Sequence, residues 1–203
     1  MPSRKQRSES GLLGLLIGVL VLLCVPAFAQ KPANKVRLAI QTELGQIEAE
    51  IYPAKAPLSA ANFLQYVDGG LYDGGVVHRT VKPDNQPNNA IKIEVIQASI
   101  HSDKKSFAPI KLERTNQTGL KHVNGTISMA RSGPDTATSD FFICIGAQPE
   151  LDFGGKRNPD GQGFAAFGKV TKGMNVVQKI QQSAAEGQRL KPPIKILSLK
   201  RKK

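Results

Sequence analysis

The chain has 203 residues, of which 40% are hydrophobic and 22% charged, and its formal net charge is +12. No internal repeat or long low-complexity linker divides it, which favours one domain with a sizeable core over a repeat protein.

The start of the chain predicts a secretory signal peptide. Three basic residues precede an apolar run at 12–25, and Ala27-Phe28-Ala29 supplies small residues for signal peptidase. The run is shorter than the roughly 20 residues of a membrane-spanning helix, which disfavours an uncleaved anchor. Bulky Leu23 before Cys24 disfavours lipoprotein processing. We therefore expect residues 1–29 to be removed near Ala29, with membrane contact only transiently during export.

The predicted mature chain, residues 30–203, is strongly basic. Residues 1–29 hold three basic residues and one acidic residue, so their removal leaves a formal charge of +10. An exported, periplasmic or secreted protein with this charge is expected to meet anionic envelope surfaces rather than nucleic acid. The basic tail at 200–203 is interpreted as solvated. Cys144 cannot form an internal disulfide alone, and we expect a buried small hydrophobic residue.

Patterning along the chain predicts many short strands and two helices. A β-hairpin is expected at 35–52, and Pro57 and Gly69-Gly70 delimit a short amphipathic helix. Further strands are expected at 75–81, 91–99, 126–131, 139–146, 164–170 and 194–199, with a second helix at 174–185. This composition of elements favours an antiparallel barrel over parallel βαβ units.

Two polar residues stand among apolar neighbours in the segment VVHRTVKPDNQPNNAIKIEVIQ. Strict alternation places Val77, Arg79 and Val81 on one face of one strand, and Val95 and Gln97 on one face of the next. On strands that bury one face, this pattern indicates a satisfied structural pair or a site. The turn formers between the strands allow the loop ends to meet, so Arg79 and Gln97 are expected to lie close together.

The adjacent residues Phe141 and Phe142 must point to opposite faces of their strand. One can fill the core while the other is available to a groove. Burial of both between two layers is the alternative.

Several ordered motifs together carry a family resemblance. The segment TELGQIEAEIYPAKAPLSAANFLQYVDGGLYDGGVVHRT, the block GTISMARSGPDTATSDFFI, and LDF followed by FAAFGKVTKGMNVVQKI occur in one order along almost the whole predicted mature chain. They resemble the cyclophilins, which are peptidyl-prolyl cis-trans isomerases. The resemblance implies a mainly β fold: a closed antiparallel eight-stranded barrel capped by two α-helices.

The resemblance also implies site residues. Arg79 is expected to be the catalytic arginine, Gln97 the partner of the substrate carbonyl, and Phe142 and Leu151 walls of a proline pocket. The further substrate-binding positions that it implies are Val95, Ala130, Phe164 and His78. Because alternation places His78 on the face opposite Arg79, a structural hydrogen-bonding role is favoured for it over general-base catalysis.

The chain departs from the family pattern in two loops and several positions. Residues 82–94 form an extra insertion between the arginine and the glutamine, and the glycine-rich stretch 152–163 is an expanded surface loop without nucleotide-loop spacing. Glu150 stands where cyclosporin-sensitive members have tryptophan, so weak cyclosporin binding is expected.

The expected activity is isomerisation of X-Pro bonds in unfolded or extended exported proteins. Rotation has a barrier of roughly 18–20 kcal/mol, which an arginine directed at the imide nitrogen can lower without proton transfer, metal or organic cofactor. A monomer is expected. Two alternatives are a chaperone or scaffold that binds proline segments with little turnover, and a polyanion-binding envelope protein, which would not explain the groove residues.

Overall fold

A computed structural model describes residues 35–202, together with Met1. The predicted signal peptide and its cleavage site near Ala29 lie outside the described residues and stay predictions. None of the helices in the described part is both long and apolar enough to span a bilayer.

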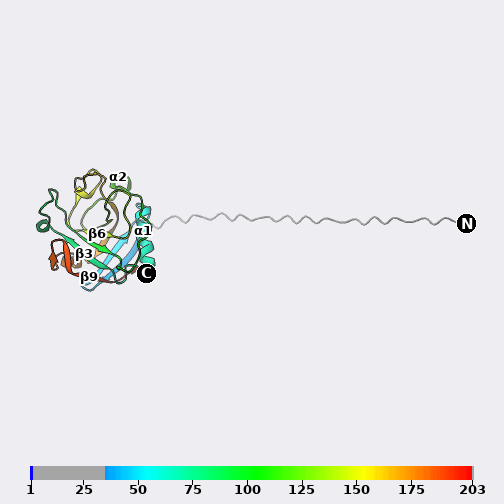
Figure 1. Cartoon of the computed structure of the whole chain (residues 1–203), viewed down its shortest axis with the longest axis horizontal. Coiled ribbons are helices and arrows are strands. Elements are labelled where there is room, and N and C mark those ends of the chain that lie inside the picture. The colour runs from blue at the N-terminus through cyan, green and yellow to red at the C-terminus, as the bar shows by residue number, and fades with distance from the viewer. Residues whose placement is uncertain (2–34, 203) are drawn as a thin grey trace. The chain divides into compact units, whose positions relative to one another are not determined.

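Nine strands form one antiparallel sheet in the order β1-β2-β7-β5-β6-β4-β3-β9-β8. The strands are β1 (Val36–Thr42), β2 (Gly45–Ile51), β3 (Val76–Val81), β4 (Val95–Ser99), β5 (Thr126–Met129), β6 (Phe141–Cys144), β7 (Ala165–Lys172), β8 (Ala185–Glu186) and β9 (Arg189–Arg201). Pairing of β1 with β9 closes eight strands into a barrel, and the two-residue strand β8 extends β9 as a short hairpin. The predicted eight-stranded barrel is confirmed (Figure 1).

The helices cover the barrel. They are α1 (Pro57–Asp68), α2 (Thr115–Thr118) and α3 (Met174–Gln181), with 3₁₀ turns η1 (Pro83–Asn85) and η2 (Pro149–Leu151). Helix α1 packs against β7 and β9, and α3 packs against β2, β3 and β4. Pro57 occupies the first turn of α1, where a missing N–H costs no helical hydrogen bond, and Phe63, Tyr66 and Val67 form its buried face. The one-turn helix α2 was not predicted.

The expected strand at 91–99 starts later than predicted, at Val95. The side chain of Gln86 takes the place of a neighbouring strand for Ile93: its Nε2 donates to the Ile93 carbonyl at 2.8 Å, and its Oε1 accepts from the Ile93 N–H at 3.2 Å. A side-chain amide therefore satisfies backbone groups that a sheet ladder would otherwise satisfy. The loop ends still meet, because Val81 pairs with Val95.

Buried apolar residues form two clusters. The larger one, here called the barrel core, contains Phe63, whose ring centroid lies 5.1 Å from that of Phe141 and 5.0 Å from that of Phe167. The smaller one, here called the pocket cluster, consists of Val81, Ile93, Val95, Phe142, Cys144 and Leu151, with Ala130 and Phe164 packed against it. Adjacent Phe141 and Phe142 are thus divided between the clusters, as alternation predicts. Cys144 is fully buried, and burial raises the pKa of its thiol.

Candidate active site

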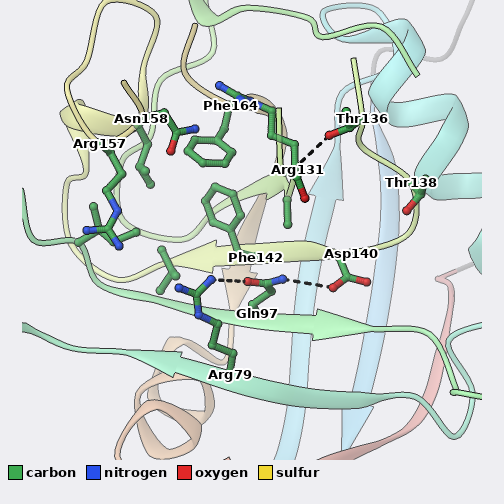
Figure 2. Close-up of a pocket in the computed structure, with 15 residues that line it drawn as sticks. Arg79, Gln97, Arg131, Thr136, Thr138, Asp140, Phe142, Arg157, Asn158 and Phe164 are labelled. Carbon is green, nitrogen blue, oxygen red and sulfur yellow. Dashed lines mark hydrogen bonds between the residues drawn. The ribbon is translucent and has the colours of Figure 1, made fainter. Parts of the chain in front are cut away.

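A cavity of about 560 Å³ opens over the pocket cluster. Seven of the eight predicted site residues line it: Arg79, Val95, Gln97, Ala130, Phe142, Leu151 and Phe164. They come from β3, β4, β6, η2 and the ends of two loops, so the barrel wall itself supplies a rigid floor (Figure 2).

Arg79 and Gln97 lie directly opposite each other in the β3–β4 ladder. Arg79 Nη1 donates to Gln97 Oε1 at 3.0 Å, and Gln97 Nε2 donates to Asp140 Oδ2 at 3.2 Å, which gives the row of side chains in Figure 2. The prediction that the insertion leaves these two residues in contact is confirmed. Burial lowers the pKa of Arg79, but a guanidinium remains charged at any pH at which the protein is folded.

A second glutamine, which the sequence analysis missed, fixes the Arg79 guanidinium. Gln188 Oε1 accepts from Arg79 Nε at 3.0 Å and from Nη2 at 2.6 Å. Gln188 Nε2 in turn donates to the Asn85 carbonyl in the 82–94 insertion at 3.1 Å. Gln188 lies in the β8–β9 turn, and it reaches the site because Arg189 pairs with Arg79 across β9 and β3. No local signal in the sequence connects residues 79 and 188.

Phe142 forms the floor of the cavity and is held on two sides by rings. Its ring meets Phe164 edge-on, with centroids 5.3 Å apart and an interplanar angle of 88°. It stacks on the ring of His122 at 5.9 Å and 16°. The floor is therefore aromatic, apolar and fixed in orientation, which suits a small saturated ring such as that of proline.

A buried polar network supports the stacked His122 ring. His122 Nδ1 lies 2.8 Å from Asp152 Oδ1, and Nε2 lies 2.9 Å from Ser128 Oγ. Burial raises the pKa of Asp152, but hydrogen bonds from His122 and the charge of Lys121 outweigh it and leave that pKa below its ordinary value. Ser128 is 0% exposed and His122 1%, so no substrate reaches this Ser-His-Asp arrangement. It holds Phe142 from below, and the sequence analysis missed it.

The prediction for His78 is wrong in two respects. A β-bulge between Val77 and Arg79 interrupts the alternation, so Val77 joins the barrel core while Arg79 faces the cavity. His78 does not line the cavity: with Arg79 and Gln188 it borders a second hollow beside it. Its Nδ1 is buried without a hydrogen-bond partner among residues 35–202, so the expected structural hydrogen bond is not formed.

Charge around His78 is mixed. Burial lowers the pKa of His78, and Arg79 and Arg189 act in the same direction, whereas Asp140 opposes them. The His78 Nε2 lies 4.0 Å from Asp140 Oδ2. The imidazole is therefore neutral near pH 7, beside a catalytic candidate that stays charged.

The 152–163 loop forms one wall of the cavity. Arg131 anchors it with hydrogen bonds from Nη1 and Nη2 to Asp160 at 2.8 and 2.9 Å, and it also donates to the Gly163 carbonyl. The Arg131 guanidinium lies 5.0 Å from the Phe164 ring centroid. Arg157, from the same loop, enters the cavity as well. Neither arginine was among the predicted site residues.

Glu150 does not line the cavity. Its Oε2 accepts from the backbone N–H of Lys156 at 2.7 Å, which fixes the start of the expanded loop. Among the described residues, no group of three or more His, Cys, Asp or Glu side chains is placed to hold a metal ion.

Comparisons with known proteins identify the family. Residues 37–201 match the model of the family described as cyclophilin type peptidyl-prolyl cis-trans isomerase/CLD. The chain is 40% identical over 166 residues to a peptidyl-prolyl cis-trans isomerase of Acinetobacter baylyi, which covers 79% of this chain and 82% of the relative. It is 38% identical over 177 residues to peptidyl-prolyl cis-trans isomerase A of Dickeya dadantii, covering 86% of each.

Solved structures share the fold. The crystal structure of a cyclophilin type peptidyl-prolyl cis-trans isomerase from Cryptosporidium parvum superposes with a TM-score of 0.67 at 20% identity, covering 83% of this chain and 98% of that one. A second structure of that protein, in the presence of the dipeptide ala-pro, gives a TM-score of 0.66. With the fold, the groove residues and the family match in agreement, this chain belongs to the cyclophilin-type peptidyl-prolyl cis-trans isomerases.

Proposed function

We propose that the protein isomerises X-Pro bonds of unfolded or extended polypeptides after export, with Arg79 as the catalytic residue. The observation that carries the proposal is the fixed Arg79 guanidinium beside an apolar aromatic floor at Phe142. The basic, apolar and small-residue pattern of residues 1–29 supports export.

Two N–H donors of the Arg79 guanidinium remain available to substrate. A guanidinium has five N–H donors, and Gln188 and Gln97 take three of them. The two that remain belong to Nη1 and Nη2. A donor directed at the imide nitrogen stabilises the twisted bond, in which the nitrogen lone pair is no longer delocalised, more than either planar ground state. Arg79 therefore lowers the rotation barrier without transferring a proton.

Gln97 and Phe142 hold the two ends of the bond. Gln97 Nε2 has two N–H donors and gives one to Asp140, so the other remains for the substrate carbonyl. The Phe142 ring, fixed by Phe164 and His122, receives the proline ring. Holding one end while the other turns places the substrate close to the transition-state geometry.

Turnover of proline tetrapeptides in a protease-coupled assay tests the proposal. Arg79→Ala is expected to lower kcat/KM by about 10²–10³, by comparison with loss of an oxyanion-hole donor. Arg79→Lys should also be poor, because lysine keeps the charge but cannot bond Gln188 and Gln97 as a planar fork. Arg37→Gln, which removes an exposed positive charge on β1, serves as the control. Near-full activity of a folded Arg79→Ala protein would show that Arg79 is structural.

Two further measurements test the cellular part of the proposal and its alternative. Intact-mass analysis of the exported protein should give a chain that starts at Gln30. A chain that retains residues 1–29, or a lipidated one, contradicts this. A wild-type protein that binds proline peptides without accelerating their isomerisation would instead be a proline-segment-binding chaperone or scaffold.

A further inference from the structure

Arg157 brings a positive charge into the cavity from the expanded loop. Its side chain is half-buried and lines the cavity on the side of Phe142 opposite Thr138 and Asp140 (Figure 2). Burial lowers the pKa of Arg157, and the charge of Arg79 lowers it further. Both effects disfavour a cation at this position.

Arg131 and Arg157 differ in whether a carboxylate neutralises their charge. Arg131 is 1% exposed and forms a two-pronged ion pair with Asp160. Arg157 forms no ion pair with a carboxylate of residues 35–202, and its one side-chain hydrogen bond there goes from Nη1 to the neutral carbonyl of Ile91. Four of its five N–H donors are thus uncommitted within the described residues. A guanidinium so placed is a ready partner for a carboxylate.

A proline segment bound in the cavity would bring such a partner. With the proline ring over Phe142, the chain must leave the floor on both sides: one side borders Thr138 and Asp140, and the other borders Arg157. An acidic side chain next to the proline on the Arg157 side would meet the uncommitted donors, whereas lysine or arginine there would be repelled by both Arg157 and Arg79.

We propose that Arg157 forms a subsite for a carboxylate side chain directly adjacent to the substrate proline, so that the enzyme favours proline segments flanked by Asp or Glu. This inference rests on the proposed isomerase function and specifies its substrate class. Arg157 acts on specificity, and Arg79 remains the catalytic residue.

Matched peptides test the subsite. Each pair differs only by Glu against Gln at one position, directly before or directly after the proline, and amidated C-termini leave the side chain as the sole carboxylate. We expect kcat/KM to favour Glu by about 3- to 10-fold at one of the two positions, since a partly exposed charge pair contributes modestly. The preference should shrink as salt rises.

Variants of Arg157 test whether this residue causes the preference for Glu over Gln. Arg157→Gln should bring the Glu-to-Gln ratio to about 1, and Arg157→Glu should reverse it in favour of a Lys peptide. Arg37→Gln, which removes one exposed charge that does not line the cavity, should keep the wild-type ratio. Because Arg157 also bonds the Ile91 carbonyl, circular dichroism and urea unfolding should accompany each variant. If Arg157 only holds the loop through its bond to Ile91, its substitution should change activity equally for both peptides.

The outcomes separate this inference from the proposed function. A wild-type ratio near 1 at both positions, with good turnover, overturns the subsite and leaves the isomerase intact. A preference that survives in Arg157→Gln overturns the assignment to Arg157. If no peptide is turned over, the proposed function fails, and fluorescence anisotropy with the same labelled peptides decides whether the acidic preference exists in binding alone.

Discussion

The barrel core and the pocket cluster are two apolar regions that the sequence places side by side, in Phe141 and Phe142, but that have different surroundings. Phe141 packs edge-on against Phe63 and Tyr72 inside the barrel. Phe142 borders an open cavity, and the buried His122 network holds its ring from behind. Apolar packing orders the Phe141 ring, whereas the Phe142 ring rests on His122, which buried hydrogen bonds hold in place. The Phe142 ring must keep its orientation even though one of its faces borders the cavity, where a ligand would bind.

Truncation of each phenylalanine should give the largest difference between the two regions. Phe141→Ala leaves a void in the barrel core and should lower the free energy of unfolding by about 3–5 kcal/mol. Phe142→Ala enlarges a cavity that is already open to solvent, so its cost should be clearly smaller, while kcat/KM falls because proline loses its floor. Urea unfolding and peptide turnover measure the two effects. Equal stability losses would show that Phe142 is an ordinary core residue.

Substitutions in the buried network of His122, Asp152 and Ser128 test whether it supports Phe142. His122→Ala removes the ring behind Phe142 and leaves buried oxygens of Asp152 and Ser128 without that partner, so it should cost about 2–3 kcal/mol of unfolding free energy. Ser128→Ala removes only the bond to Nε2 and should cost about 1 kcal/mol. Urea unfolding compares them, and kcat/KM should fall more in His122→Ala. Unchanged activity in a folded His122→Ala protein would contradict a supporting role for this ring.

The sequence was sufficient for the barrel and for the main groove residues, because local patterns indicated the short strands and the family resemblance supplied the closed barrel and the site positions. Alternation separates Phe141 from Phe142, and turn formers allow Arg79 and Gln97 to meet across a ladder. The bulge at His78 was missed, because strict alternation takes no account of an extra residue in one strand. The strand β4 begins only at Val95, and the Gln86 side chain satisfies the backbone groups of Ile93 that an earlier start would have paired.

The rest of the site depends on contacts between distant parts of the chain. Gln188 reaches Arg79 only through the register of β9 against β3. Arg157 enters the cavity because the expanded loop is fixed by Glu150 at its start and by Arg131 and Asp160 near its end. His122 and Asp152, thirty residues apart, meet beneath Phe142. Neither residue type nor spacing signals any of these meetings.

Gln188 should act on catalysis through the orientation of Arg79. Gln188→Met keeps the side-chain length but accepts neither hydrogen bond, so kcat should fall about 3- to 10-fold with a smaller change in KM, as the guanidinium gains freedom. Gln188→Glu keeps the acceptor and should restore part of the loss. In an Arg79→Ala background, Gln188→Met should have almost no further effect. An undiminished effect there would mean that Gln188 supports the fold rather than the arginine.

His78 should give the smallest effect, one that depends on pH. Because burial lowers its pKa in the folded protein, the unfolded chain, with an ordinary value of about 6.5, takes up the proton first as pH falls. The unfolded state then binds more protons, so stability should decline as pH drops from about 6.5 through the folded pKa, and change no further through this group below it.

The contribution of His78 should stay below about 1 kcal/mol, because a third of its side chain is exposed and solvent screens the charge. Urea unfolding of wild type and His78→Asn between pH 7.5 and about 4.5 measures it. The other histidines are present in both proteins, so the difference between the two curves isolates this ring. We expect wild type to lose more stability than the variant on acidification. A wild type that loses less would mean that Asp140 outweighs burial and the two neighbouring arginines, so that the folded protein takes up this proton more readily than the unfolded chain does.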